Sequence, residues 1–233
     1  MKRIGIIGGL SAESTAVFYL AITRAYTAQF GTAAYPEMVL YSVSFEPMLA
    51  WANTGHWDRF ADGLLAGIRA VARGGADFAV IAANMPHRVF DQVVAQSPVP
   101  LLHIADAVAT RAGALGCRRV ALLGTRATMA ASFYPERLEA RAGIATLVPD
   151  ETDQIAIQTI IERELVRGVI TPESTQRFQA IIHTMAQQGA EAVVLGCTEI
   201  PLLISDANSP LPVLDSTQLF AERTLQEAVG QSE

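Results

Sequence analysis

The sequence predicts an α/β protein built as two similar lobes, each with a mainly parallel sheet flanked by helices. Short apolar runs, typical of buried strands, alternate along the chain with longer stretches in which apolar residues recur at helical spacing. Such an alternation favours parallel strands joined by helices. A second observation is an internal repeat, in which segments of the first half of the chain return in the second half.

The expected strands are short, and longer helices separate them. We expect strands at 4–7, 38–44, 78–83, 101–104, 119–123, 145–148, 193–195 and 213–214. We expect the main helices at 12–29, 58–73, 88–95, 105–113, 133–142, 153–167 and 172–188, and a last one that ends at 229. Ser11 is a suitable cap for the first helix, and Gly74 and Gly75 are suitable to end the helix at 73.

The internal repeat aligns the strand ends of the two halves. The matching segments are Arg3–Gly8 with Arg119–Gly124, Gly75–Asn84 with Gly189–Thr198, and Ser97–Leu102 with Ser209–Leu214. We therefore expect an N-terminal lobe at 1–98 and a C-terminal lobe at 99–233, with the C-terminal helix or other segments able to exchange between them. Lobes that face each other would bring equivalent strand ends to one cleft, where Cys197 would lie opposite Ala83.

The composition argues against several classes of partner. The chain has 233 residues and a formal net charge of -6, and its lysines and arginines form no cluster, so we expect no nucleic-acid partner. No apolar run reaches the roughly 18 residues that span a bilayer, so we expect no membrane association. The two cysteines make no disulfide framework, which agrees with a reducing cytoplasm.

The residues that usually hold cofactors and metals are scarce. Lys2 is the only lysine, which makes a pyridoxal phosphate Schiff base improbable and excludes the Gly-Lys-Ser/Thr of a P-loop. The four histidines and two cysteines show no metal-ligand spacing. We therefore expect neither a cofactor nor a metal.

The strongest candidate for chemistry is the stretch Gly196–Glu199, which follows an apolar β-branched run. In an open α/β sheet, ligands bind at the carboxyl ends of the strands. A thiol there can act as acid, base or nucleophile, and positive surroundings would lower its pKa from about 8.5 toward neutrality. The alternative is a buried structural cysteine. The repeat favours a functional Cys197, because a packing cysteine has no reason to fall where the symmetry places a shared site.

Two acid/base groups on opposite faces of a carbon can invert a stereocentre without a cofactor. The enolate that forms needs hydrogen-bond donors at its carboxylate oxygens, and backbone N–H groups, Asn84, Thr125 and Thr198 can supply them. The turn at 8–15, with Gly9 and Ser11, can offer N–H groups at a helix N-terminus. The alternative for this turn is an ordinary strand-to-helix connection.

At these residues the chain resembles the aspartate/glutamate racemase superfamily, the cofactor-independent amino-acid racemases. The matching segments are Ile6–Thr15, Asn84 with His87, Leu122–Thr125, and Gly196–Ile200. The resemblance implies two pseudo-symmetric Rossmann-like lobes with the active site in the cleft between them, a small carboxylate or amino-acid substrate, and often a homodimer. It also implies that Cys197 is one of two acid/base residues and that Asn84, Thr125 and Thr198 contact the substrate.

The chain departs from the superfamily at the second acid/base position. Members usually carry Cys, or sometimes Thr, just before the Asn of the first motif, whereas this chain has Ala83, and a methyl group cannot exchange a proton. Met85 stands where the superfamily often has Thr. The pocket therefore looks more apolar than an aspartate site should be.

Three functions are compatible with this departure. The first, which we expect, is a racemase in which Cys197 is one base and water or another group, with His87 as a candidate, is the other. The second is a one-thiol enzyme that protonates one face only, as the arylmalonate decarboxylases of the superfamily do. The third is a catalytically weak protein that binds a small carboxylate.

Other residues receive weaker predictions. Cys117 precedes a strand and is expected to be structural. Glu13 and Glu199 suit the first turns of helices, with contact to the substrate amino group as the alternative. His103 and Asp215 are equivalent in the repeat and are candidates for supporting groups.

Overall fold

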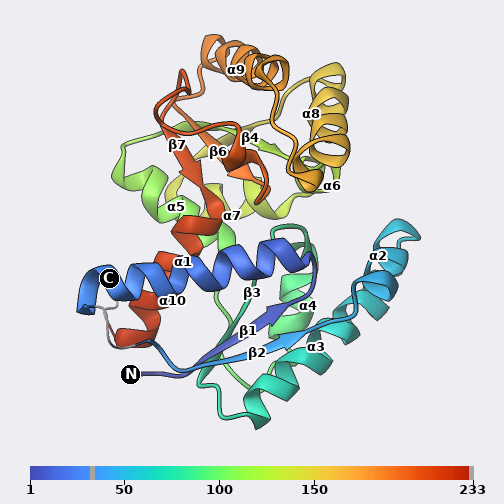
Figure 1. Cartoon of the computed structure of the whole chain (residues 1–233), viewed down its shortest axis with the longest axis vertical. Helices are drawn as coiled ribbons and strands as arrows, with labels where there is room; N and C mark the ends of the chain where they lie inside the picture. The colour runs from blue at the N-terminus through green and yellow to red at the C-terminus, as the bar shows by residue number, and fades with distance from the viewer. Residues whose placement is uncertain (32–34, 231–233) are drawn as a thin grey trace. The chain divides into compact units, whose positions relative to one another are not determined.

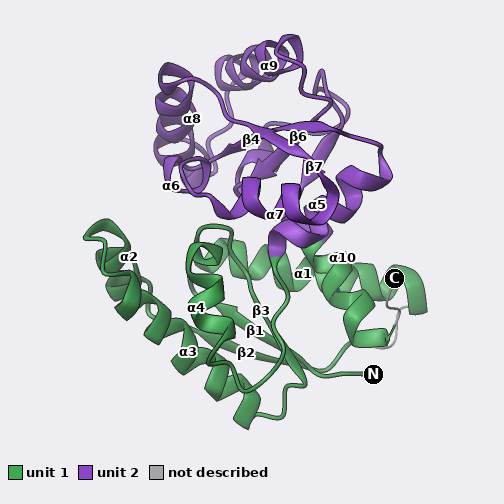
Figure 2. Cartoon of the chain, turned by 180° about the vertical axis from the view of Figure 1, so that it is seen from behind, with its two compact units in different colours: residues 1–103, 220–233 green, residues 104–219 purple. Residues whose placement is uncertain are grey.

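The computed structural model describes residues 1–31 and 35–230, and these form two compact units (Figure 2). Unit 1 comprises Met1–His103 and Phe220–Glu233, and unit 2 comprises Ile104–Leu219. Each unit holds one parallel sheet flanked by helices, which confirms the predicted α/β class (Figure 1). Among the described residues, no helix combines the length and the apolar character that crossing a membrane requires.

Unit 1 is built on a three-stranded sheet in the order β2-β1-β3. Its strands are β1 (Ile4–Gly8), β2 (Met38–Ser42) and β3 (Phe78–Ile81), and its helical segments are α1 (Ala12–Phe30), α2 (Phe45–Asn53), α3 (Trp57–Arg73), η1 (Met85–Val89) and α4 (Phe90–Val94). The central strand β1 is buried along its whole length because it has a neighbour on each side and helices over the sheet. Ile7 packs there against Leu64 and Ile68 of α3.

Unit 2 is built on a four-stranded sheet in the order β5-β4-β6-β7. Its strands are β4 (Arg119–Gly124), β5 (Ala145–Leu147), β6 (Ala192–Gly196) and β7 (Val213–Asp215). Its helical segments are α5 (Ile104–Ala114), α6 (Arg126–Met129), α7 (Phe133–Ala142), α8 (Glu151–Arg163), η2 (Leu165–Arg167), α9 (Pro172–Gln187) and η3 (Ile200–Leu202). The apolar run of β6 is fully buried, as its β-branched composition predicts.

The last helix, α10 (Ser216–Val229), begins in unit 2 and continues into unit 1. Within unit 1, the ring of Phe220 lies 5.5 Å from that of Phe18, and the backbone N–H of Lys2 donates to the carbonyl of Ala228. The compact units therefore differ from the halves 1–98 and 99–233 at residues 99–103 and at the C-terminal helix, which from Phe220 onward belongs to unit 1 and packs against α1.

The internal repeat is present at the level of single hydrogen bonds. Gly75, before β3, has φ +87°, and Gly189, before β6, has φ +93°. Two residues after each glycine, the N–H of Asp77 donates to the carbonyl of Arg3 and the N–H of Glu191 donates to the carbonyl of Arg119, both over 2.9 Å. Only glycine adopts such φ values without strain, which explains why both positions carry it. The two halves therefore share turn geometry as well as element order.

The expected strand at 101–104 is wrong. Leu101 makes only an isolated bridge with Ala79, and Ile104 already begins α5. The helix starts two residues after Leu102, so the backbone turns away before a further pair can form. The equivalent segment of unit 2 forms the short strand β7, in which Val213, Leu214 and Asp215 all pair with β6.

Candidate functional site

The candidate residues of unit 2 gather at the carboxyl ends of β4 and β6. The two strands are parallel neighbours, with Gly124 opposite Gly196, so the next residues, Thr125 and Cys197, lie side by side at one edge of the sheet. The strands meet closely there, since a Cβ placed on Gly124 would lie 3.0 Å from the carbonyl oxygen of Gly196. Because Gly124 and Gly196 have no side chains, the two strands can approach closely, which brings the side chains of Thr125 and Cys197 near each other.

Cys197 forms a hydrogen-bonded pair with Glu199. The cysteine is 9% exposed, and its Sγ donates to Oε2 of Glu199 over 2.9 Å. The hydroxyl of Thr198 donates to the same carboxylate oxygen over 2.8 Å. Glu199 and Thr198 are both half-buried. The short segment between β6 and η3 thus holds a thiol, a hydroxyl and a carboxylate within hydrogen-bond distance.

Burial raises the pKa of the Cys197 thiol well above its usual value, and the negative charge of Glu199 and its hydrogen bond raise the pKa further. The backbone N–H groups of Glu199 and Thr198 act in the opposite direction and are outweighed. The expectation that this thiol titrates near neutrality is therefore wrong. Cys197 holds its proton at neutral pH, and the nearest acceptor for that proton is the Glu199 carboxylate.

Thr125 has a structural task in addition to its position beside Cys197. Its hydroxyl oxygen accepts from the backbone N–H of Thr128 and lies 3.0 Å from the Thr128 hydroxyl, so it caps α6. On the other side of β6, the carboxylate of Asp215 accepts from the N–H groups of Thr217 and Gln218 at the start of α10. Asp215 is thus a helix-capping residue.

In unit 1, Gly9 and Ser11 form the connection from β1 to α1. Gly9 has φ +85°, and a Cβ there would lie 2.3 Å from the carbonyl oxygen of Val43, so only glycine fits. The N–H of Gly9 donates to the hydroxyl of Thr15 over 2.9 Å, and Ser11 caps α1 by accepting from Ser14. Because Thr15 already accepts from Gly9, that N–H is not available to a substrate carboxylate.

Ala83, Asn84 and Met85 follow β3, the neighbour of β1. Ala83 and Met85 are half-buried, and Asn84 is buried. The backbone carbonyl of Asn84 accepts from the N–H of His87, which opens the turn of η1. This strand end therefore presents a methyl group, an amide and a thioether.

His87 lies in a buried aromatic cluster directly behind Ala83. Its Nδ1 is 3.0 Å from the carbonyl oxygen of Ala83, and its ring stacks on Phe90 and meets the rings of His103 and Phe220 edge-on. The side chain is 1% exposed. These contacts hold the backbone at Ala83 in place, and they bring His103 next to His87.

The sequence-predicted residues thus fall into two sets. Cys197, Thr198, Glu199 and Thr125 gather in unit 2, and Gly9, Ser11, Ala83, Asn84, Met85 and His87 gather at the carboxyl ends of the unit 1 strands. The sequence analysis did not pair Glu199 with the thiol, and the Cys-x-Glu spacing at a strand end is the signal that can reveal this pair. In the part of the chain that the structure describes, no three His, Cys, Asp or Glu side chains are placed to hold a metal ion together.

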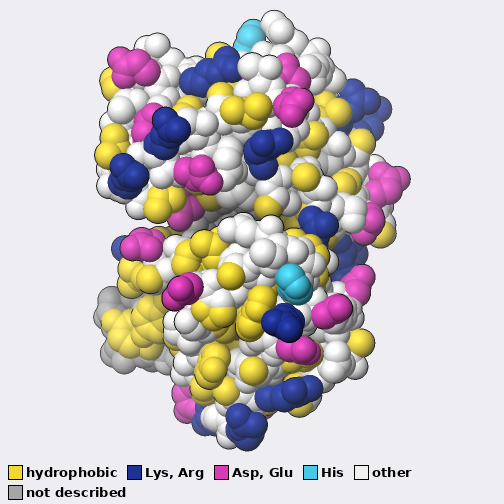
Figure 3. All heavy atoms as spheres, turned by 90° about the vertical axis from the view of Figure 1, so that its right-hand side faces the viewer, with side chains coloured by type: hydrophobic (Ala, Val, Ile, Leu, Met, Phe, Trp, Pro, Cys, Tyr) yellow, Lys and Arg dark blue, Asp and Glu magenta, His cyan; other side chains and the backbone are white. Residues whose placement is uncertain are grey.

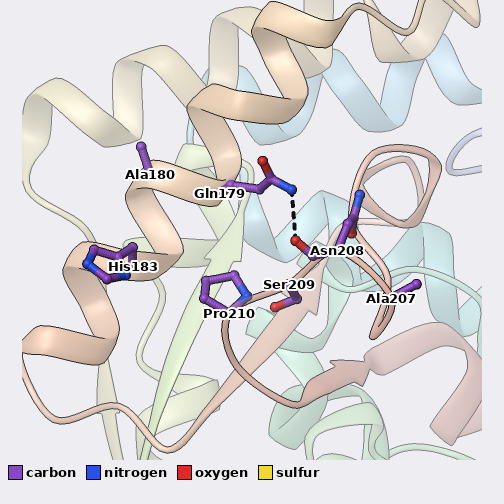
Figure 4. A pocket seen from close by; sticks show the side chains of 7 residues that line it. All are labelled: Gln179, Ala180, His183, Ala207, Asn208, Ser209 and Pro210. Carbon is purple, nitrogen blue, oxygen red and sulfur yellow. Dashed lines mark hydrogen bonds between the residues drawn. The ribbon is translucent and has the colours of Figure 1, made fainter.

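A hollow of about 530 Å³ lies elsewhere on unit 2 (Figure 4). It is lined by α9 and by the loop before β7, where the side chain of Gln179 donates to the carbonyl of Asn208 and His183 lies at the rim. This loop precedes β7, so the hollow is at the amino ends of the strands, opposite the end that carries Cys197. It is therefore separate from the candidate site.

The comparisons with known proteins agree with this architecture. The family model for Asp/Glu/hydantoin racemases matches residues 7–224. The chain belongs to the Asp/Glu/hydantoin racemase family. A crystal structure of a protein assigned as an Asp/Glu racemase from Yersinia pestis is 36% identical, with a TM-score of 0.93 over 98% of this chain and 100% of that one.

Two further relatives of this racemase family member extend the comparison. An aspartate racemase homologue from Pyrococcus horikoshii is 35% identical, with a TM-score of 0.89 over 98% of this chain and 100% of the other. The broad specificity amino-acid racemase RacX of Bacillus subtilis is 24% identical over 95% of this chain and 96% of its own length. These matches support a racemase-type activity for the family member described here.

Proposed function

We propose that this chain is a cofactor-independent amino-acid racemase that uses Cys197 as its acid/base at the substrate Cα. The observation that carries the proposal is the hydrogen-bonded pair of Cys197 and Glu199 at the carboxyl end of β6, in a chain of the racemase family. A buried thiol beside a carboxylate can both hold and release a proton, which is what exchange at Cα requires.

The proton path follows from the 2.9 Å contact. The thiol of Cys197 passes its proton to Glu199, and the resulting thiolate removes the proton from Cα, which leaves an enolate on the substrate. Reversal of the two transfers returns a proton to the same face. In this proposal Thr125 and Asn84 donate to the substrate carboxylate, and Thr198, whose hydroxyl proton goes to Glu199, accepts from the substrate amino group. Gly9, Ser11 and Met85 contribute to the walls of the binding site.

Ala83 marks the position where a second base is missing. Its methyl group cannot exchange a proton, so protonation of the opposite face falls to water or to another group. His87 is a weaker candidate for that role than the sequence indicates, because its ring is buried and its Nδ1 contacts the Ala83 carbonyl. We therefore propose racemization that is slow relative to one-sided proton exchange.

Deuterium incorporation tests the proposal. Each enantiomer of aspartate, glutamate and several apolar amino acids is incubated with the enzyme in heavy water, and deuterium at Cα and the enantiomer ratio are followed separately. We expect exchange with retention to exceed exchange with inversion, and Cys197→Ala to lower both by at least about 100-fold. Unchanged exchange in Cys197→Ala would refute the role of the thiol.

The same residues also favour a second candidate, a one-thiol decarboxylase. Ala83 and Met85 make the strand end of unit 1 apolar, which suits a substrate with an apolar substituent and a single proton donor. Release of CO₂ from substituted malonates, with a product of one configuration, would establish this function. Binding of these acids without exchange or turnover would instead indicate a carboxylate-binding protein.

The remaining parts of the proposal concern conditions and assembly. We propose that the enzyme works in the cytoplasm, as a homodimer, without a cofactor or a metal. Activity that survives treatment with a chelator and with a carbonyl reagent such as hydroxylamine would support a reaction without a metal and without a carbonyl cofactor. A site shared by the strand ends of the two units stays a prediction.

A further inference from the structure

His87 holds the two carbonyl groups that flank the Cα of Asn84 at the carboxyl end of β3. Its ring Nδ1 lies 3.0 Å from the carbonyl oxygen of Ala83, and its backbone N–H donates to the carbonyl oxygen of Asn84 over 3.1 Å. A carbonyl oxygen can only accept, so Nδ1 must carry the proton and donate it. One residue therefore fixes two successive carbonyls, and the side chain of Asn84 projects from the backbone between them.

The imidazole of His87 is itself held by rings from other segments of unit 1. It stacks on Phe90 of α4 with ring centroids 5.7 Å apart, and it meets His103, just before α5, and Phe220 of α10 edge-on at 4.6 and 5.8 Å. All four side chains are at most 5% exposed, and histidine is accordingly scarce on the molecular face in Figure 3. In so dense a cluster, the ring cannot turn Nδ1 away from Ala83 without displacing a neighbour.

The equivalent strand end of unit 2 carries proline in place of this histidine. Asn84 corresponds to Thr198 in the internal repeat, so the residue three positions later, His87, corresponds to Pro201, which has neither a side-chain donor nor a backbone N–H. The carbonyl of Cys197 accepts instead from the backbone N–H of Ile200 over 3.3 Å. A short helical segment, η3, thus forms after β6 without an imidazole, which points to a task for His87 at the strand end that carries Asn84.

We propose that His87 is a positioning residue, which fixes the backbone on both sides of Asn84 and thereby aims the Asn84 amide at the substrate carboxylate. This inference rests on the proposed function, in which Asn84 is one of the carboxylate donors. A donor that is already in place needs no reordering when the substrate arrives, which lowers the cost of binding. His87 should therefore act mainly on substrate binding and little on proton transfer at Cys197.

Two replacements of His87 separate its hydrogen bond from its ring. His87→Phe keeps an aromatic ring in the cluster and removes the donor, whereas His87→Asn places an amide N–H near the position of Nδ1 and leaves part of the ring's volume empty. In the deuterium-exchange assay, His87→Phe should raise KM about five- to tenfold, the usual effect of one lost hydrogen bond, and change kcat less than about threefold. His87→Asn should have a KM closer to that of wild type.

A purely structural role predicts the opposite order, because asparagine leaves the larger cavity and costs more stability. Phe60→Leu is the matched control for lost packing, since Phe60 is fully buried in the core of unit 1 and lies outside the His87 cluster. It should lower stability and keep KM within about twofold of wild type. An unchanged KM in His87→Phe, or a larger rise in His87→Asn than in His87→Phe, would overturn the proposal.

Two further measurements do not depend on turnover. NMR of the imidazole nitrogens should show that His87 carries a proton on Nδ1, and a ring protonated at Nε2 alone would overturn the proposal. In the Cys197→Ala background, His87→Phe should raise the dissociation constant of the same amino acid about five- to tenfold, and an unchanged constant would also overturn it. Unchanged exchange in Cys197→Ala alone would refute the proposed chemistry and leave both of these results standing.

Discussion

The carboxyl ends of β3 and β6 are built alike and carry opposite chemistry. Both strands follow a glycine with positive φ, and the backbone N–H groups that open β1 and β4 donate to an acidic side chain, Asp77 in unit 1 and Glu191 in unit 2. Ala83 then presents a methyl group, whereas Cys197 presents a thiol bonded to a carboxylate. A repeated scaffold therefore keeps its turn geometry while its reactive groups change, because the turn depends on backbone hydrogen bonds and the chemistry on single side chains.

The largest expected effect follows removal of the one thiol at a strand end. Cys197→Ala should lower the rate of deuterium exchange at Cα by about 100- to 10,000-fold, the usual contribution of a general acid/base group. Cys117→Ala is the matched control, because Cys117 lies before β4 and not at a carboxyl end. Its exchange rate should stay within about twofold of wild type. Equal losses in both variants would remove the functional difference between the two cysteines.

Restoring a thiol to unit 1 should make the two strand ends alike. Ala83→Cys places a proton-exchanging group at the equivalent position and should raise the rate of inversion at Cα about tenfold or more. Ala83→Val changes the size of the side chain without adding an exchangeable proton. A gain in Ala83→Val equal to that in Ala83→Cys would show that shape, and not the missing base, limits the reaction.

The shared turns allow a comparison of stability. Gly75→Ala and Gly189→Ala should each lower the free energy of unfolding by about 1–2 kcal/mol, because both residues have φ near +90°. Gly113→Ala in α5 is the control, because it should raise the free energy of unfolding. The new Cβ would meet no atom closer than 3.8 Å, and alanine stabilises a helix by about 0.5–1 kcal/mol relative to glycine. Urea unfolding measures all three. A loss of stability in only one of the two variants Gly75→Ala and Gly189→Ala would show that the two turns are not equivalent.

The smallest expected effect concerns the partner of the thiol. Glu199 raises the pKa of Cys197, so Glu199→Gln should lower that pKa and increase the rate of alkylation of Cys197 by iodoacetamide severalfold at mildly alkaline pH. Glu13→Gln, at the corresponding distance after the β1 turn, should not change it. A slower alkylation in Glu199→Gln would show that the carboxylate promotes thiolate formation instead of opposing it.

The same pKa predicts a pH dependence of stability. The folded thiol of Cys197 has a higher pKa than the unfolded one, so the folded state binds more protons above about pH 8.5. The free energy of unfolding should therefore fall as the pH rises from there through the pKa of the folded state. The free energy of unfolding of Cys197→Ala should fall less steeply over the same pH range, and urea titrations at several pH values measure this difference.

Much of the fold was predictable because its signals are local. The apolar runs of β1, β4 and β6, the glycine after α3 and the cap at Ser11 each depend on neighbouring residues in the chain. The prediction of a strand at 101–104 was wrong because strand pairing there depends on where α5 begins, and tertiary packing sets that start. The short helix α6 was missed because it has only four residues and starts from the Thr125 cap.

By itself, the sequence determined the repeat, the place of Cys197 after a buried strand, and the methyl group of Ala83 at the equivalent position, because these are properties of residue order and spacing. Only the tertiary structure decided that Glu199 accepts from the thiol, that His87 is enclosed by Phe90, His103 and Phe220, and that α10 packs against Phe18 of α1. Side-chain orientation and burial set these contacts, and through them the pKa of the one thiol on which the proposed chemistry depends.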